Sequence, residues 1–311
     1  MQVKNKLYQF ALLFILLTPI LSADTVEEIA KKAHLASINT LLIFTSQDSL
    51  NSGLYHFTKV GVDMHIYHLP FSYTINPNDD SIEYFLVGNV GYSKVNISDN
   101  VVIPPNSRLN YENYIATYTG GLGIGMRYKF SKELFISAGV EFIYSRSGTR
   151  VTQPDDNIGN AIEDFFNKNY NDNISYKLFT EAEYKPKIDM LNPYVKLSYK
   201  TYQTKSSFTF DELTKFTTDS SITTLTLGAE THKLINFDKK YLTLEAYLTA
   251  NYLDGVVANT VQFNKYTSIG AVSYLYTNVT SWIKRYFLEL NVVEGNGLNG
   301  YNIGIGFTID Y

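Results

Sequence analysis

The chain has 311 residues, with 26 Lys and Arg against 30 Asp and Glu, a formal net charge of −4 and no cysteine. This weak acidity disfavours a nucleic-acid binder, and the lack of cysteine excludes a disulfide framework, a cysteine-ligated zinc site, a thiol nucleophile and a lipid-modified N-terminal cysteine. Hydrophobic residues make up 45% of the chain and aromatic residues 15%, a composition too apolar for a disordered protein.

Residues 1–23 have the pattern of a secretory signal peptide. Two lysines precede an apolar run, residues 10–17, and the small pair Ser22-Ala23 provides a cleavage site after Ala23. The run is shorter than the ~20 residues that a transmembrane helix requires. We therefore expect export followed by cleavage, with an uncleaved signal anchor as the alternative.

Residues 24–37 are predicted to form a short amphipathic helix. Thr25 is followed three residues later by Glu28, as in a capping box, and Val26, Ile29 and Ala30 recur at helical spacing. A helix here would either plug the lumen of the domain that follows or lie at its periplasmic rim. A mobile N-terminal tail is the alternative.

From residue 38 to the last residue, the dominant pattern is an alternation of apolar with small or charged side chains. In residues 114–130 the even positions are mostly aromatic or aliphatic, while the odd positions after Ile115 hold Thr, Gly, Arg and Lys. Successive side chains of a strand point to opposite faces, so each such segment is a two-faced strand. At ~10–14 residues these strands are longer than most strands of soluble proteins and match the ~9–11 residues of a tilted membrane-spanning strand.

Twelve strands are predicted, with ten or fourteen as alternatives. Both ends of a bacterial barrel normally lie in the periplasm, which requires an even number of strands. The predicted strands are residues 38–45, 60–74, 82–92, 114–130, 133–146, 174–185, 193–204, 221–232, 240–253, 266–278, 281–293 and 300–311. A soluble sandwich is the alternative, but only a closed barrel pairs every backbone group of membrane-spanning strands.

The connections alternate between short turns and long polar loops, as in outer-membrane barrels. Residues 47–57, 93–113 and 147–173 are expected to be external loops, the last with a short helix near residues 158–168. The apolar positions change phase near His68, which predicts a bulge or an early strand end there.

The polar face of the strands carries charges of both signs that are predicted to face the lumen. They are Arg127, Lys129, Glu141, Lys177, Glu181, Glu183, Lys196, Lys200, Glu230, Glu245, Arg285 and Glu289. In a narrow barrel such residues pair with one another, whereas in a wider barrel they line water and set ion preference. A twelve-stranded barrel lies between these cases, and we favour a narrow or plugged lumen.

No catalytic, cofactor or metal site is predicted. No histidine is followed two residues later by serine, and the candidates for an acid–histidine pair at the external rim are His56 and Asp155-Asp156. Adjacent aspartates in a Pro-Asp-Asp-Asn sequence are more often turn formers. The glycine-rich residues 120–125 lie within a strand, so they do not form a phosphate-binding loop.

An export signal and about twelve amphipathic strands, with the segments Leu69-Pro-Phe-Ser-Tyr73 and Gly304-Ile-Gly-Phe-Thr-Ile-Asp-Tyr311, resemble the solitary outer-membrane autotransporter-like β-domain family. The resemblance implies an all-β transmembrane antiparallel barrel over residues 38–311, without a passenger domain. The C-terminal strand that ends at Tyr311 also looks like the signal read by the outer-membrane assembly machinery.

The expected protein is therefore an integral barrel of the Gram-negative outer membrane, surrounded by outer-membrane lipid. The first hypothesis for its function is a non-enzymatic structural or surface role through external loops. The alternatives are a small porin-like channel for solutes and, less favoured, an outer-membrane hydrolase.

Overall fold

The computed structural model of the protein describes residues 51–59, 62–75, 81–103, 107–152, 170–188, 191–208, 216–237, 240–277 and 283–309. The signal peptide predicted over residues 1–23, the helix predicted over residues 24–37 and the strand predicted over residues 38–45 lie outside these ranges. They remain predictions.

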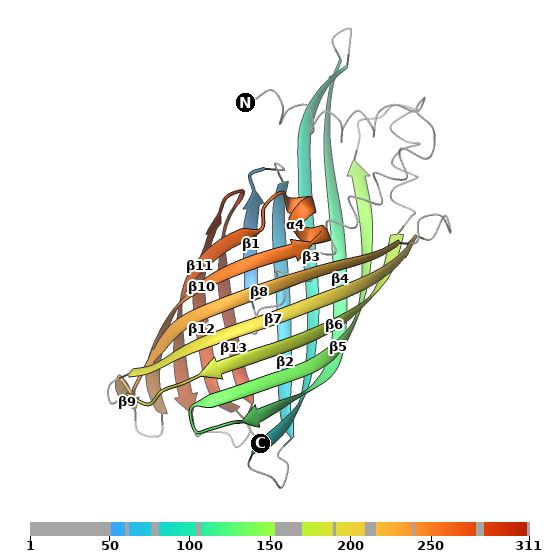
Figure 1. The fold of residues 1–311 in the computed structure, drawn as a ribbon. Helices are drawn as coiled ribbons and strands as arrows, with labels where there is room; N and C mark the ends of the chain where they lie inside the picture. The colour runs from blue at the N-terminus through green and yellow to red at the C-terminus, as the bar shows by residue number, and fades with distance from the viewer. Residues whose placement is uncertain are drawn as a thin grey trace.

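The described chain consists almost entirely of antiparallel strands (Figure 1). The strands are β1 (Asn51–Phe57), β2 (Val62–Ile75), β3 (Ile82–Ile103), β4 (Ser107–Lys129), β5 (Leu134–Thr152), β6 (Tyr170–Tyr184), β7 (Leu191–Phe208), β8 (Phe216–Thr231), β9 (Ile235–Phe237), β10 (Lys240–Gly255), β11 (Lys265–Thr277), β12 (Ile283–Gly295) and β13 (Leu298–Ile309). One short helix, α4 (Val256–Val261), follows β10. No described helix has the length and apolar composition needed to cross a membrane.

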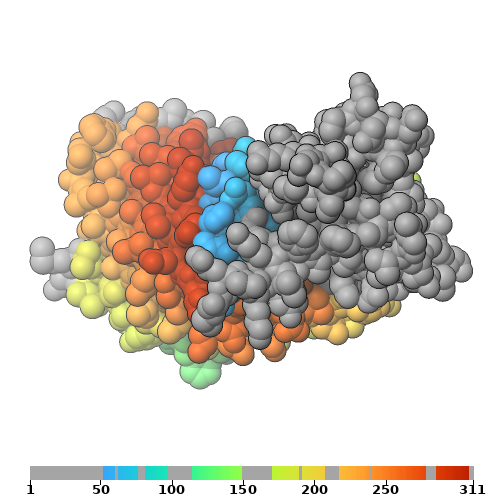
Figure 2. Space-filling view, turned by 90° about the horizontal axis from the view of Figure 1, so that it is seen from above, coloured from blue at the N-terminus to red at the C-terminus, as the bar shows by residue number. Residues whose placement is uncertain are grey.

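The sheet closes into a barrel. Each strand pairs with its neighbours in chain order, β1 pairs with β13, and β10 pairs with both β8 and β11. The three-residue β9 pairs with the beginning of β10, so it stands outside the ring of twelve. Viewed from above, the blue N-terminal strands lie directly beside the red C-terminal ones (Figure 2). The predicted twelve-stranded antiparallel barrel is confirmed.

Alternation along the strands gives the barrel an apolar outer surface. On β4 the outward side chains of Leu122 and Ile124 are 68% and 61% exposed, whereas the intervening position, Gly123, faces inward. Outward aliphatic residues continue around the ring and are bordered by aromatic ones, such as Tyr67 and Tyr73 on β2. A broad exposed apolar belt between aromatic girdles is the surface that a bilayer covers. The fold is thus that of a transmembrane β-barrel.

The two ends of the barrel differ. We call the end with the tight connections, where β4 turns into β5 and β13 ends, the turn end. In its β4–β5 turn, the Ser131 hydroxyl accepts hydrogen bonds from the backbone N–H groups of Glu133 and Leu134. We call the opposite end, with α4 and the tall β3–β4 hairpin, the loop end (Figure 1).

The first described strand lies where an external loop was expected. Residues 51–57 were assigned to the loop 47–57, but they form β1. Tyr55 and Phe57 point into the barrel and are 1% and 3% exposed, so burial inside the lumen holds this segment in the wall. The prediction failed because these inward residues are apolar, where a polar lumen was assumed.

The expected bulge near His68 is absent. The register of β2 with β3 runs without a shift from Asp63 opposite Asn96 to Ile75 opposite Tyr84. The apolar residues of β2 switch from the inward to the outward face because the two halves of this strand have different surroundings. Inward residues toward the loop end, such as Met64 and Ile66, are buried in the lumen, while outward residues toward the turn end lie in the apolar belt.

One expected long loop is mostly strand, and the two ends of another are strand. β3 extends to Ile103 and β4 begins at Ser107. The predicted loop 93–113 is therefore a paired hairpin. β5 extends to Thr152 and β6 begins at Tyr170, and the helix predicted near residues 158–168 lies outside the described ranges. Helix α4 and strand β9 were not predicted.

Candidate functional site

Apolar side chains fill the lumen at the loop end. Strands β1–β5, β7, β8 and β10–β13, together with α4 and Phe263 between α4 and β11, contribute to one buried cluster, called here the lumen core. Its members are Tyr55, Phe57, Met64, Ile66, Val95, Ile115, Ile143, Tyr202, Ile222, Leu253, Val257, Val261, Phe263, Tyr266, Val293 and Leu298. Because the cluster includes residues from nearly every strand around the barrel, side chains fill the lumen at this level.

Helix α4 lies inside the barrel mouth as part of the lumen core. Val257 and Val261, four residues apart on one helical face, are 0% and 4% exposed. Left-handed backbone at Gln262, with φ of 61°, turns the chain back toward β11. The Lys59 ammonium group donates a 2.9 Å hydrogen bond to the Gln262 carbonyl, which ties the β1–β2 turn to the end of the helix.

Below the lumen core, toward the turn end, lies a polar cavity of about 670 Å³. It extends from Lys132 and Lys187 at the turn end to Ile222 and Tyr266, which belong to the lumen core. The structure brings eight of the predicted lumen-facing charges to this cavity: Glu181, Glu183, Lys196, Lys200, Glu230, Glu245, Arg285 and Glu289.

Some of these charges form ion pairs along the cavity wall. Lys196 lies 3.6 Å from Glu181 on the adjacent strand, and Arg285 lies 3.9 Å from Glu230. The Arg285 guanidinium also donates a 2.7 Å hydrogen bond to the Tyr276 hydroxyl. The wall is therefore largely neutralised by its own residues.

Two glutamates on the cavity wall are held by tyrosines. Glu245 accepts hydrogen bonds from the hydroxyls of Tyr194 and Tyr274, the latter at 2.9 Å, and Glu289 accepts one from Tyr247. These tyrosines were not predicted, because a tyrosine on the polar face of a strand does not stand out as a charged residue does. Parity places Tyr247 in the same row as Glu245, so the alternation did contain a signal for it.

The four other predicted charges lie away from this cavity and have partners of their own. Glu83, which was not predicted, is 2.7 Å from Lys129 and 3.7 Å from Arg127. Glu141 is nearly fully buried, lies 2.8 Å from Lys177 and accepts a hydrogen bond from the Asn89 side-chain amide.

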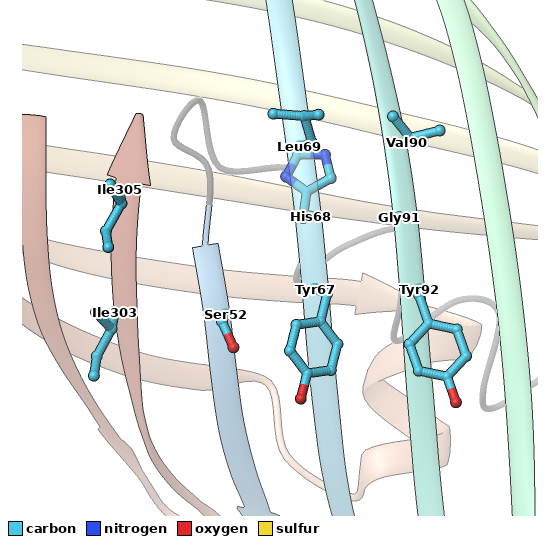
Figure 3. Close-up of a pocket in the computed structure, with 9 residues that line it drawn as sticks. All are labelled: Ser52, Tyr67, His68, Leu69, Val90, Gly91, Tyr92, Ile303 and Ile305. Carbon is cyan, nitrogen blue, oxygen red and sulfur yellow. The ribbon is translucent and has the colours of Figure 1, made fainter. Parts of the chain in front are cut away.

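A second hollow lies on the outside of the barrel. This groove of about 660 Å³ spans β13, β1, β2 and β3 and is lined by Ser52, Tyr67, His68, Leu69, Val90, Gly91, Tyr92, Ile303 and Ile305 (Figure 3). Most of its walls are apolar side chains that point outward, such as Leu69, Val90 and Ile305. The groove therefore belongs to the membrane-facing surface.

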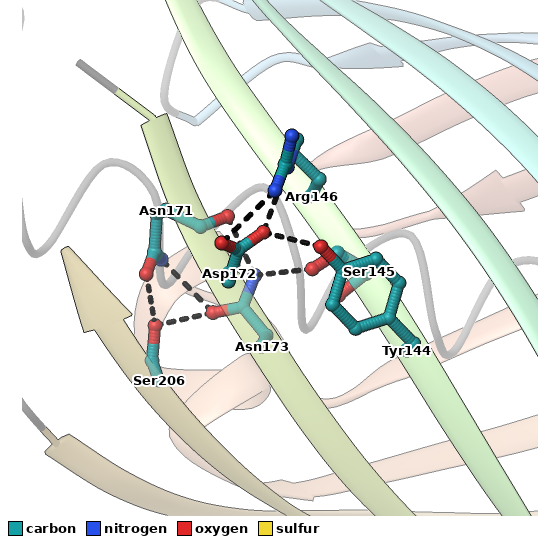
Figure 4. A network of polar contacts seen from close by, with 7 residues as sticks. All are labelled: Tyr144, Ser145, Arg146, Asn171, Asp172, Asn173 and Ser206. Atoms are coloured by element: carbon teal, nitrogen blue, oxygen red, sulfur yellow. Dashed lines mark hydrogen bonds and ion pairs between the residues drawn. The ribbon is translucent and has the colours of Figure 1, made fainter. Parts of the chain in front are cut away.

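A polar network joins β5, β6 and β7 at the loop end (Figure 4). Above the apolar belt, the Arg146 guanidinium donates to both Asp172 oxygens, at 2.8 and 3.2 Å, and the Tyr144 hydroxyl donates to the same carboxylate. Burial raises the pKa of Asp172, but these hydrogen bonds outweigh it and leave the pKa below its ordinary value. On the inward side, Asn171 and Asn173 bind each other and Ser206.

The candidates for hydrolytic chemistry are not assembled in the described residues. His56 faces outward on β1 and contacts the Asp63 carboxylate across the β1–β2 pair, while Asp155 and Asp156 lie outside the described ranges. Within the described part of the chain, no three His, Asp or Glu side chains gather as metal ligands would.

No family model and no curated protein sequence matches this chain. Among solved structures, the chain is similar to the translocator domain of the autotransporter NalP from Neisseria meningitidis, with a TM-score of 0.58, 10% identity, and 92% of this chain and 99% of that chain covered. The transport unit of AIDA-I from Escherichia coli gives a TM-score of 0.55 at 10% identity, covering 90% and 99%. The β-domain of the Bordetella autotransporter BrkA gives 0.53 at 7% identity, covering 83% and 96%. The chain thus has the twelve-stranded barrel fold of autotransporter translocator domains.

Proposed function

We propose that this protein is an integral barrel of the Gram-negative outer membrane that is closed to solutes and acts through its external surface, without enzymatic activity. The observation that carries the proposal is the lumen core. It occupies the barrel at one level with buried aliphatic and aromatic side chains, and water and ions do not cross such packing.

The orientation follows from the connections. In outer-membrane barrels the short turns face the periplasm and the longer connections face outward. On that basis the turn end is periplasmic, and the polar cavity opens toward the periplasm. The lumen core and the β3–β4 hairpin are then external, and the hairpin is the most prominent element available for contacts at the cell surface (Figure 1).

A gated channel is the second candidate, and the polar cavity favours it. Charges of both signs line about 670 Å³ of space below the lumen core, as they would in a pore with weak ion preference. Among the described residues, α4 and the rest of the lumen core separate this cavity from the loop end. A channel would therefore depend on displacement of the helix.

Single-channel conductance of refolded residues 24–311 tests the proposal. We expect no steady conductance, either from this protein or from a version that also lacks residues 24–37. Steady conductance of the intact form would refute closure, whereas conductance of the shortened form alone would assign closure to residues 24–37.

Two charge substitutions on α4 test whether the buried face of this helix closes the lumen. Val257→Asp places a carboxylate within the lumen core, whereas Asn259→Asp places the same group on the exposed side of the helix. We expect current fluctuations from Val257→Asp and none from Asn259→Asp. If both variants fold and neither shows current fluctuations, α4 is not the element that closes the lumen.

We also propose that the last strand directs assembly into the membrane. β13 alternates outward apolar residues, such as Ile303 and Ile305, with inward small ones, and the sequence ends on the aromatic Tyr311. Tyr311→Ala should slow insertion in the presence of the assembly machinery but not spontaneous insertion into thin bilayers. Equal slowing in both assays would contradict a role in recognition.

A further inference from the structure

Three basic side chains point outward from the barrel wall at the loop end. They are Lys94 on β3, Arg146 on β5 and Lys205 on β7, and together they are called here the basic sector. Each has the parity of the outward residues of its strand; Arg146 and Lys205 are exposed and Lys94 is half-buried. A charge on the outer wall of a membrane barrel is unfavourable in the hydrocarbon and tolerated at its edge.

The basic sector lies just above the aromatic girdle. Each of its residues is one outward position closer to the loop end than a tyrosine of its own or the neighbouring strand: Tyr92 for Lys94, Tyr144 for Arg146 and Tyr176 for Lys205. Tyrosines of this kind lie at the level of the lipid headgroups. The three cations are therefore in the headgroup layer of the leaflet at the loop end.

The basic sector keeps donors that the protein does not use. Among the described residues, neither Lys94 nor Lys205 has an acidic partner. The Lys94 ammonium lies 4.4 Å from the centroid of the Tyr114 ring. Arg146 donates to Asp172 through Nε and Nη2, so its Nη1 can donate to another acceptor (Figure 4). Three cations against one carboxylate leave the sector positively charged.

The other side of the barrel has the opposite charge at this level. Near their loop ends, β8, β10 and β12 carry the exposed acidic residues Asp219, Asp254 and Glu294 at outward positions. Lys265 on β11 is the one described cation among them. An anionic headgroup is attracted to β3–β7 and repelled by β8–β12, so the charges select one side of the barrel.

A shelf of small residues lies between Lys94 and Arg146. Lys94 is opposite Ala116 on β4, and Ala116 is opposite Gly148 on β5. A Cβ atom added to Gly148 would have nothing within 4 Å, so the space above the shelf is open. Neighbouring strands are about 4.8 Å apart, so the backbones of Lys94 and Arg146 are separated by roughly 10 Å, and their long side chains can converge on an anion over the shelf.

We propose that the basic sector binds the phosphorylated headgroup of lipopolysaccharide, the outer-leaflet glycolipid whose lipid A carries two phosphates on a disaccharide. One phosphate lies over Ala116 and Gly148 between Lys94 and Arg146, where a guanidinium and an ammonium group both donate to it. The second phosphate contacts Lys205, and the acyl chains lie along the apolar belt. This inference rests on the external placement of the loop end in the proposed function.

Native mass spectrometry of refolded residues 24–311 in detergent measures the affinity for three probes: bisphosphorylated lipid A, monophosphorylated lipid A and phosphatidylglycerol. The test variant is the triple substitution Lys94→Gln, Arg146→Gln and Lys205→Gln. Its matched control removes the same charge from exposed residues of the turn end, through Lys132→Gln, Lys185→Gln and Lys187→Gln. Far-UV circular dichroism reports that each variant is folded.

A second pair of variants tests the shelf without a change of charge. Gly148→Leu fills the space between Lys94 and Arg146. Gly120→Leu adds the same side chain in the apolar belt, where a Cβ atom also has nothing within 4 Å. We expect weaker binding of bisphosphorylated lipid A by Gly148→Leu and unchanged binding by Gly120→Leu.

We expect the triple variant of the basic sector to bind bisphosphorylated lipid A roughly tenfold or more weakly, because each basic residue near an anionic lipid contributes to the attraction. The turn-end control should bind like the wild type, which should prefer the bisphosphorylated lipid to the other two probes. Equal loss in both triple variants, equal affinity for all three lipids, or wild-type binding by Gly148→Leu would overturn the proposal. Binding in detergent requires neither a closed lumen nor a given orientation, so this inference and the proposed function can fail separately.

Discussion

The buried pair Glu141–Lys177 offers the sharpest test of how the barrel interior is stabilised. The Glu141 side chain is 2% exposed and that of Lys177 is 14% exposed, with 2.8 Å between the charged atoms. Lys177→Met keeps most of the aliphatic stem but removes the positive charge. The Asn89 amide would then be the only remaining partner that we identify for the carboxylate.

The expected cost follows from the geometry. At 2.8 Å and an effective dielectric constant of about 20, Coulomb's law gives an attraction of about 6 kcal/mol, which desolvation of both groups partly offsets. Removing one partner leaves the other charge buried and uncompensated, which typically costs about 3–5 kcal/mol. Glu141→Gln together with Lys177→Met removes both charges, so this double variant should be more stable than Lys177→Met alone.

Urea unfolding from phospholipid vesicles, followed by far-UV circular dichroism and by the fluorescence of the single tryptophan, measures these free energies. The matched control is Lys185→Met, since Lys185 is 2.9 Å from Glu183 but is 52% exposed. Such a pair contributes only about 0–1 kcal/mol. The reasoning is refuted if the two lysine variants lose similar stability, or if the Glu141 and Lys177 substitutions are additive.

Three further substitutions test the barrel wall and its rim. Gly123→Val should destabilise the barrel by about 1–3 kcal/mol or more, since a Cβ atom there would lie 2.2 Å from the Val140 carbonyl oxygen, whereas Gly120→Ala, with nothing within 4 Å, should be neutral in the same urea assay. Asp172→Asn should cost less than about 1 kcal/mol at neutral pH because the pair with Arg146 is screened by solvent. Because the pKa of Asp172 is lowered in the folded state, its stabilisation is present above the unfolded pKa of about 4 and is lost as the pH falls further. A stability difference between wild type and Asp172→Asn that does not shrink as the pH falls below about 4 would contradict this account.

The strand pattern was predictable because a period of two is local. Each side chain of residues 114–129 on β4 has the face that its parity assigns, and an even strand number follows from the topology of a barrel. The position of β1 was not predictable in this way, because Tyr55 and Phe57 are apolar and inward. When the inward residues of a strand are apolar, the sequence alone does not show which face of the strand points into the lumen.

For the charged residues too, the sequence predicts the face of the strand but not the contacts. Parity assigned Glu245 and Glu289 to the lumen face, but it could not supply their tyrosine partners, which lie 29 to 51 residues away in the sequence. Helix α4 left no readable signal, since the six residues Val-Val-Ala-Asn-Thr-Val are too few for helical periodicity and are rich in residues that favour strands. Its helical form depends on burial of Val257 and Val261 inside a barrel that the local sequence does not describe.

The lumen core also has a consequence for the order in which the barrel forms. Phe57 stacks against Phe263 with ring centroids 6.2 Å apart, and Lys59 bonds to Gln262 across a separation of 203 residues. These contacts exist only after β1 has met β13, so no partly assembled sheet can gain them in advance. Long-range contacts of this kind slow folding. Ring closure and core formation should therefore occur as one late, cooperative event, and a chain arrested before that event would present an open edge and an unburied aromatic face.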